Sequence, residues 1–198
     1  MAENIHPIFD SILKTEQKEA LLEQQSQVIW MVGLSGSGKS TLARALENSL
    51  HEKGILTALL DGDNLRTGIN NNLGFSEEER TENIRRAAET AKLLAANGVV
   101  TICSLISPLE SIRSMAKSII GDKYYEVFID CPLDICESRD VKGLYAKARK
   151  GLIKNFTGID SPFEPPKQAD LIVKTGEQGL EESLNEMLEK ILPIVKLN

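Results

Sequence analysis

The chain has 198 residues, of which 41% are hydrophobic and 26% are charged, and its formal net charge at pH 7 is -6. This length accommodates one well-cored domain with a short appendage, and the composition is typical of a globular protein rather than a disordered one. The acidic balance argues against nucleic acid or an anionic membrane surface as a partner, so any polyanionic ligand must bind at a local basic site.

The first 26 residues are polar and rich in glutamine and glutamate. We expect them to form a helical arm over residues 1–26, followed by a single domain over residues 27–198. The same pattern fits an arm that packs on its own domain and an arm that packs on a second subunit. The apolar residues of the arm have the spacing of an amphipathic helix and are Ile8, Ile12, Leu13, Leu21 and Leu22.

The cysteines and the absence of long apolar runs indicate the compartment. Cys103, Cys131 and Cys136 are odd in number and lack the spacing of metal ligands, so we expect reduced thiols that serve as packing residues. The sequence shows no apolar leader and no run of about 18 apolar residues, the length needed to cross a membrane. These features predict a cytoplasmic protein.

From residue 28 onward, short apolar runs alternate with longer segments of helical periodicity. Strands are predicted at 28–33, 55–60, 99–105, 125–130 and 170–174, and helices at 39–53, 77–97, 107–120, from 133 and at 178–195. This order predicts an α/β fold with a five-stranded parallel sheet, whose strands are buried on both faces beneath helices. Ligands of such sheets bind beyond the carboxyl ends of the strands.

The segment GLSGSGKST follows the first predicted strand and opens the first helix of the domain. It fills every fixed position of the pattern G-x4-G-K-[ST], which predicts a phosphate-binding loop at a helix N-terminus. A glycine-rich turn that only caps the helix is the weaker alternative. Lys39 is expected to reach the outer phosphates and Ser40 to ligate Mg²⁺. The predicted ATP-binding residues are Gly33, Leu34, Ser35, Gly36, Ser37, Gly38, Lys39, Ser40 and Thr41.

Two carboxylates, Asp61 and Asp63, follow the second predicted strand in the sequence DGDN. Asp61 with Ser40 would form the magnesium site, and Asp63 could accept a proton from an attacking hydroxyl. Taken alone, DGDN is equally typical of a turn. Beside a phosphate-binding loop, the interpretation as a functional pair is favoured.

A basic segment over residues 139–166 fits neither a strand nor a simple amphipathic helix. A connection of this length inside a compact domain is more typical of a lid or a binding loop than of a spacer. The Asn-Lys-x-Asp stretch of guanine-specific sites is absent. A small P-loop protein with a basic lid indicates a phosphotransferase that closes over two anionic ligands and excludes water.

An ordered series of segments resembles the adenylylsulfate kinases, P-loop kinases that transfer the γ-phosphate of ATP to the 3′-hydroxyl of adenosine 5′-phosphosulfate. The segments are GLSGSGKST, DGDNLR, LGFSEEERTENIRR, SLISP, CPLDICESRDVKGLYAKAR and FTGIDSPFEPP. The resemblance implies a P-loop NTPase fold, ATP and adenosine 5′-phosphosulfate as ligands, Mg²⁺ as cofactor, a homodimer, and a place in sulfate assimilation.

The resemblance also implies roles for individual residues. Asp63 would orient or deprotonate the attacking hydroxyl, Lys142 would act near the phosphates together with Lys39, and Arg139 would flank the ATP adenine. The arginines would hold the phosphosulfate and the phenylalanines would stack on the acceptor base. The implied substrate-binding residues are Arg66, Phe75, Arg80, Asn83, Ile106, Ser107, Lys142, Leu152 and Phe156.

Two of these residues have simpler interpretations. Arg80 can be an exposed helix arginine that pairs with Glu77 or Glu79, and Ser107 can be the N-cap of the next helix. Some family members are described as passing through a phosphoserine at the position of Ser107, a catalytic role that two substrates bound in line do not require.

Two alternative functions remain open from the sequence. One is another small-metabolite P-loop kinase of the gluconate or nucleoside type. The other is a nucleotide-dependent binding module that has lost catalysis.

Overall fold

A five-stranded sheet forms the centre of the computed structural model, which describes residues 4–197. The strands are β1 (Val28–Val32), β2 (Thr57–Asp61), β3 (Val100–Ser104), β4 (Tyr124–Asp130) and β5 (Leu171–Lys174). Their order is β2-β3-β1-β4-β5, and every adjacent pair is parallel. The predicted parallel α/β sheet is therefore confirmed, and all five carboxyl ends meet at one rim.

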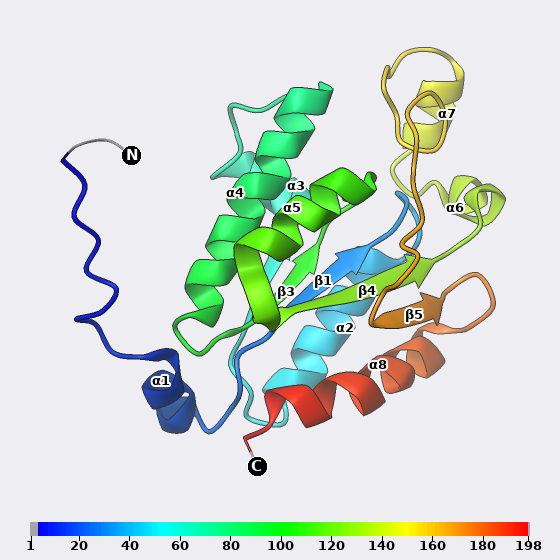
Figure 1. Ribbon diagram of the computed structural model, residues 1–198. Coiled ribbons are helices and arrows are strands. Elements are labelled where there is room, and N and C mark those ends of the chain that lie inside the picture. The colour runs from blue at the N-terminus through cyan, green and yellow to red at the C-terminus, as the bar shows by residue number, and fades with distance from the viewer. Residues whose placement is uncertain (1–3, 198) are drawn as a thin grey trace.

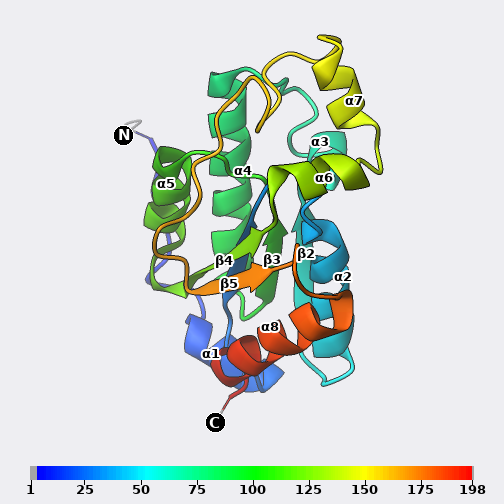
Figure 2. The same ribbon diagram turned by 90° about the vertical axis from the view of Figure 1, so that its right-hand side faces the viewer.

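Helices cover both faces of the sheet, with α4 and α5 on one face and α2 and α8 on the other (Figures 1 and 2). The short helices α3, α6 and α7 lie near the carboxyl rim (Figure 2). The bounds are α1 (Thr15–Leu22), α2 (Lys39–His51), α3 (Gly62–Thr67), α4 (Glu77–Ala95), α5 (Glu110–Ile120), the 3₁₀ turn η1 (Gly121–Lys123), α6 (Leu133–Arg139), α7 (Leu144–Arg149) and α8 (Leu180–Val195).

The central strand β1 divides its side chains between two cores. Ile29 and Met31 pack toward α2 and α8, whereas Trp30 packs toward α4 and α5. All five residues of β1 are buried, as a strand between two helical layers requires. The prediction of full burial is wrong at the sheet edges, because β2 is only half-buried and Ile172 of β5 is 45% exposed.

Over residues 4–26 the N-terminal arm is helical only in α1, and residues 1–3 of the predicted arm lie outside the described residues. Residues 5–14 form no helix and extend away from the domain (Figure 1), so the prediction of one amphipathic helix over 1–26 is wrong for this part. Its apolar side chains Ile8, Ile12 and Leu13 are exposed, as is Leu21 of α1. No helix within residues 4–197 is long and apolar enough to cross a membrane.

A buried carboxylate attaches α1 to the domain. Glu19 Oε1 accepts hydrogen bonds from the backbone N–H and the hydroxyl of Ser26, at 2.7 and 2.6 Å, and from Lys123 Nζ at 2.9 Å. Burial raises the pKa of Glu19, but the hydrogen bonds from Ser26 and Lys123 outweigh this effect and hold the pKa below its ordinary value. The ionised carboxylate is therefore the form that the fold stabilises.

Glu19→Gln should lower the free energy of unfolding by about 1–3 kcal/mol, the contribution of hydrogen bonds to a charged group. Because the folded pKa is lowered, the contribution is present above pH 4.5 and is lost as the pH falls through the folded value. Urea unfolding at pH 7 and pH 3 measures this. The exposed Glu16 of the same helix is the control, and an equal loss for Glu16→Gln would contradict the assignment.

Candidate active site

The phosphate-binding loop joins β1 to α2. At Gly36, where φ is +76°, an added Cβ would lie 2.8 Å from the carbonyl oxygen of Cys136, so no other residue fits. Gly38 is the N-cap of α2 with φ +97°. The first backbone N–H groups of a long helix therefore point to the rim, which is the anion site that the sequence predicts.

Lys39 is buried beneath this loop. Its ammonium group donates to the carbonyl oxygens of Gly33 and Leu34, at 2.9 and 2.7 Å. Burial lowers the pKa of Lys39 to about 8. A phosphate group would offer this ammonium a stronger, charged acceptor than the two carbonyls.

Three oxygen-bearing side chains meet beside Lys39, at the ends of three different elements. The Ser40 hydroxyl donates to Asp61 Oδ2 at 2.7 Å and lies 3.2 Å from the Ser104 hydroxyl. Hydroxyl and carboxylate oxygens suit Mg²⁺, which usually takes one or two protein ligands and completes its shell with water and phosphate. The predicted pair Ser40 and Asp61 is brought together, and Ser104 is an addition that the sequence interpretation missed.

The proposed base lies next to this cluster. Asp61 Oδ1 accepts a hydrogen bond from the Asp63 backbone N–H at 3.0 Å and so caps α3, which holds Asp63 at the rim. The Asp63 carboxylate forms an ion pair with Lys142 of the lid, and both side chains are exposed. The hydrogen bond to Asp63 raises the pKa of Lys142. Two predicted catalytic residues, 79 positions apart in the chain, are thus in direct contact.

Arg66, in the same short helix as Asp63, and Arg80, in α4, lie near each other. The Arg66 guanidinium lies 4.2 Å from the centre of the Phe75 ring and donates to the carbonyl oxygens of Leu73 and Gly74. Burial lowers the pKa of both arginines. Both side chains stay charged, because the ordinary pKa of arginine lies far above neutral pH. Two cations therefore line one side of the site.

Arg80 connects helix α4 to the lid. It donates to the Phe75 carbonyl at 2.9 Å, to the Thr157 hydroxyl at 2.8 Å and to the Asn155 carbonyl. The alternative pairing of Arg80 with Glu77 or Glu79 is wrong, since the Glu79 carboxylate instead accepts the backbone N–H groups of residues 74 and 76.

The remaining predicted acceptor residues differ in exposure. Phe75 is 61% exposed and Leu152 is also exposed, whereas Phe156 packs edge-on against Tyr145 with ring centres 5.0 Å apart. Asn83 is buried, and its side-chain oxygen accepts from the Asn70 amide at 3.0 Å. Placing an acceptor base between the two phenylalanines stays a prediction.

Ser107 does not cap a helix, so that prediction is wrong. Helix α5 begins at Glu110, and its N-cap Leu109 makes no side-chain cap. Ser107 is 1% exposed, and its hydroxyl accepts a hydrogen bond from the Trp30 indole at 3.1 Å. Its neighbour Ile106 is partly exposed. Because the Ser107 hydroxyl is buried and already hydrogen-bonded to Trp30, a role as a nucleophile is disfavoured.

The lid, residues 139–166, is fixed at its start to the loop after β5. Arg139 donates to the Thr175 carbonyl at 2.6 Å, and the Thr175 hydroxyl donates to the Ser37 carbonyl at 2.7 Å. Thr175 therefore links the predicted adenine-flanking arginine to the phosphate loop. Sequence reasoning missed it, although its place after the last strand in VKTG was a usable signal.

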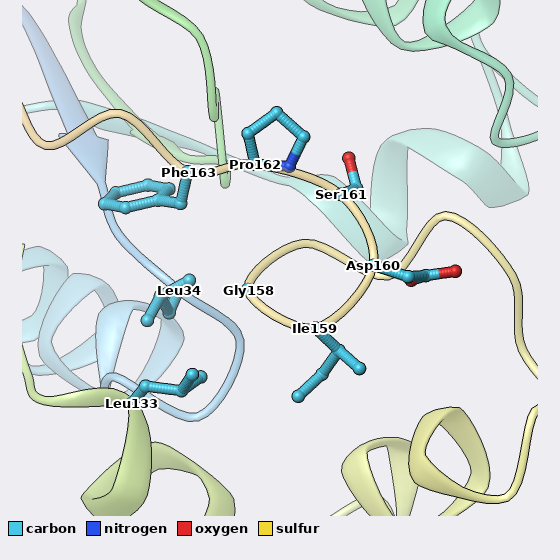
Figure 3. A pocket seen from close by; sticks show the side chains of 8 residues that line it. All are labelled: Leu34, Leu133, Gly158, Ile159, Asp160, Ser161, Pro162 and Phe163. Atoms are coloured by element: carbon cyan, nitrogen blue, oxygen red, sulfur yellow. The ribbon is translucent and has the colours of Figure 1, made fainter.

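A cavity of about 510 Å³ lies where the end of the lid meets the phosphate loop and the start of α6 (Figure 3). It is lined by Leu34, Leu133 and lid residues 158–163. Beside this cavity the lid touches the loop: a Cβ added at Gly158 would lie 3.1 Å from the side chains of both Leu34 and Leu133, and the Tyr145 hydroxyl donates to the Ser35 carbonyl at 2.8 Å. Within residues 4–197 no cluster of three or more His, Cys, Asp or Glu side chains is placed to hold a metal ion.

The fold and this arrangement define a class: the protein is a P-loop phosphotransferase. The adenylylsulphate kinase family model matches residues 25–174. The adenylyl-sulfate kinase of Bacteroides thetaiotaomicron is 58% identical over 194 residues, which are 98% of this chain and 96% of that protein. The chain belongs to the adenylylsulfate kinase family.

Two solved structures place the fold in the same family. The Mycobacterium tuberculosis APS kinase CysC, in complex with AMPPNP and APS, aligns with a TM-score of 0.82 at 46% identity, covering 85% of this chain and 98% of that one. A hexameric APS kinase from Thiobacillus denitrificans aligns with a TM-score of 0.65 at 28% identity, covering 86% of this chain and 29% of that one.

Proposed function

We propose that this protein transfers the γ-phosphate of ATP to the 3′-hydroxyl of adenosine 5′-phosphosulfate, giving 3′-phosphoadenylyl sulfate and ADP. The observation that carries the proposal is the contact between Asp63 and Lys142 beside the Ser40 and Asp61 pair. It brings a carboxylate base for the acceptor hydroxyl and a lid cation for the phosphates together beside the predicted magnesium ligands. Family membership supplies the identity of the acceptor.

In this mechanism the 3′-oxygen of the acceptor attacks the γ-phosphorus as the bond between that phosphorus and the β,γ-bridging oxygen breaks. Asp63 takes the hydroxyl proton, and the leaving group departs as ADP. Lys39 and Lys142 neutralise charge on the transferred group. Ser40 and Asp61 would hold Mg²⁺, which would supply further neutralisation of the phosphate oxygens.

The lid supports the choice of phosphoryl transfer over hydrolysis. Arg80 of α4 contacts lid residues Asn155 and Thr157, so the lid is already attached to the acceptor side of the rim. Closure of such a segment excludes water, which would otherwise accept the phosphoryl group. Arg66 and Arg80 are suited to the oxyanions of the acceptor through their planar, bidentate donors.

A panel of acceptors tests the proposal. Purified protein with ATP and Mg²⁺ should form ADP with adenosine 5′-phosphosulfate, and at least about tenfold more slowly with gluconate, a nucleoside or water, because only the first ligand fits a site with two arginines and two phenylalanines. ADP formation equal to the control without acceptor would contradict it, and preference for gluconate would favour the other kinase type.

The assembly state and setting are part of the same proposal. We expect a homodimer, supported by the exposed apolar side chains of residues 5–14, such as Ile8 and Phe9, which a second subunit could cover. Sedimentation equilibrium of the full chain should give about twice the monomer mass, and a variant lacking residues 1–14 should dissociate more readily. A monomeric full chain would contradict this expectation. A cytoplasmic location and a place in sulfate assimilation stay predictions.

A further inference from the structure

A buried polar network holds the loop of residues 104–109. We name it the Ser107 network; its members are Trp30, Ser107, Arg113, Tyr124 and Glu126. The Trp30 indole donates to the Ser107 hydroxyl at 3.1 Å, and Arg113 Nη1 donates to the Ser107 carbonyl at 3.0 Å. One residue of the loop is thus held through both its side chain and its backbone.

Arg113 is itself fixed by the sheet. Its Nε lies 3.9 Å from Glu126 Oε1, while the Tyr124 hydroxyl donates to Glu126 Oε2 at 2.7 Å. Burial raises the pKa of Tyr124, so that hydroxyl keeps its proton. Only 4% of Arg113 is exposed, and removing one partner of a buried ion pair leaves the other charge uncompensated. The network is therefore a rigid support.

The network holds the loop in an unfavourable backbone conformation. Ser107 has φ +45°, a left-handed value that a residue with a Cβ adopts only when its surroundings enforce it. The hydrogen bonds from Trp30 and Arg113 provide that enforcement. Strain of this kind is retained where a loop must present a particular residue.

The loop contacts both halves of the active site. At its start, Ser104 lies 3.2 Å from the Ser40 hydroxyl of the phosphate loop. At its end, the Pro108 carbonyl accepts from the backbone N–H of Glu164 in the lid at 2.8 Å, and the Glu164 carboxylate accepts the Glu110 backbone N–H at 2.7 Å. Between these two anchors the loop exposes part of Ile106, flanked by the buried Leu105 and Ser107.

We propose that Arg113 is a positioning residue for the acceptor: through the Ser107 carbonyl it fixes the strained loop that presents Ile106 to adenosine 5′-phosphosulfate. The inference rests on the proposed function for the identity of that acceptor. Arg113 touches neither substrate, and its effect passes through the loop backbone. Loss of Arg113 therefore weakens acceptor binding more than ATP binding, because Lys39 and Ser40 are held by β1 and α2 instead.

The test measures the KM for each substrate in Arg113→Met. We expect the KM for adenosine 5′-phosphosulfate to rise about tenfold or more, from the loss of a charged hydrogen bond, with the KM for ATP within about twofold of wild type. Arg113→Lys should recover part of the loss. Trp30→Phe, which removes the indole N–H but keeps an aromatic ring, should raise the same KM. Lys117→Met, an exposed cation on the same helix, is the matched control.

Fluorescence gives a second readout that needs no activity. Trp30 is the single tryptophan of the chain, and its indole N–H donates to Ser107, so its emission reports the state of the loop. Arg113→Met should shift that emission without any substrate present, whereas Lys117→Met should not. If Arg113→Met fails to fold, the double variant Arg113→Met/Glu126→Gln, which removes the unpaired carboxylate, takes its place.

The outcomes separate this inference from the proposed function. Equal rises in both KM values, or no rise in either, would overturn the positioning role of Arg113. If the wild-type protein does not use adenosine 5′-phosphosulfate, the proposed function fails. The emission of Arg113→Met then decides alone: a shift supports loop positioning, and an unchanged spectrum overturns it.

Discussion

Asp63→Asn is expected to lower kcat about a thousandfold while ADP binds within about twofold of wild type. Removal of a general base costs about 10²–10⁴ in rate. The amide cannot take the proton of the acceptor hydroxyl, but the phosphate loop and the Ser40 and Asp61 pair stay intact, so the nucleotide keeps its contacts. Steady-state kinetics and calorimetric titration with ADP measure the two quantities separately.

The ion pair of Asp63 with Lys142 adds a second expectation for this variant. Asparagine releases Lys142, which in the wild-type protein is shared between the base and any bound phosphate. ADP affinity should therefore stay equal or increase slightly. Asp122→Asn, an exposed carboxylate at the opposite end of the sheet, is the control. A kcat within tenfold of wild type for Asp63→Asn would remove Asp63 from its role.

Lys39→Met should weaken ATP binding about a hundredfold, because it removes a charged donor to the outer phosphates. In wild type the affinity should also depend on pH. Since burial lowers the pKa of Lys39 to about 8, the free protein holds this proton only below that pH, whereas phosphates favour the charged form. ATP affinity should be highest below pH 8 and decline above it, and titrations at pH 7 and pH 9 would show this.

The same lysine affects folding with a defined sign. Between about pH 8 and 10.5 the unfolded chain holds a proton that folded Lys39 has lost, so its contribution to the free energy of unfolding rises with pH across this window. Lys39→Met should lack this rise in ligand-free protein. The control is Lys53→Met, which changes an exposed lysine. If the free energy of unfolding of Lys39→Met depends on pH as that of wild type does, the argument from the burial of Lys39 is contradicted.

The bounds of the strands could be predicted within two residues, because a short strand buried between helices requires a short apolar run in the sequence. The prediction of burial failed at the edges, where β5 alternates buried and exposed residues on a sheet covered from one side only at that position. The N-terminal arm shows the limit of periodicity: Ile8 and Ile12 have helical spacing, yet a helix needs a packed face, and residues 5–14 find none on their own domain.

The candidate site was partly predictable for a similar reason. Motif residues such as Lys39 and Asp61 follow strands, and the carboxyl ends of parallel strands converge. The partners of Ser107 and Arg80 were not predictable, since Trp30 and Thr157 each lie 77 positions away in sequence. The short helices α3 and α7 were also missed, because six polar-rich residues carry no helical period.

The strand order has a consequence for how such a protein can change over evolution. Residues that follow β2 and β3, such as Arg66 and Ser107, lie on the flank of β1 that we propose for the acceptor, whereas Arg139 and Thr175 follow β4 and β5 on the flank that we propose for the nucleotide. Substitutions on one flank that avoid the connections between the two leave the hydrogen bonds of the other intact. Two connections join the flanks: the lid, which leaves the β4 side and reaches Arg80, and Arg113, which bonds Ser107 and pairs with Glu126 of β4. A lineage could therefore exchange its acceptor while keeping its nucleotide, provided that the lid changes with it.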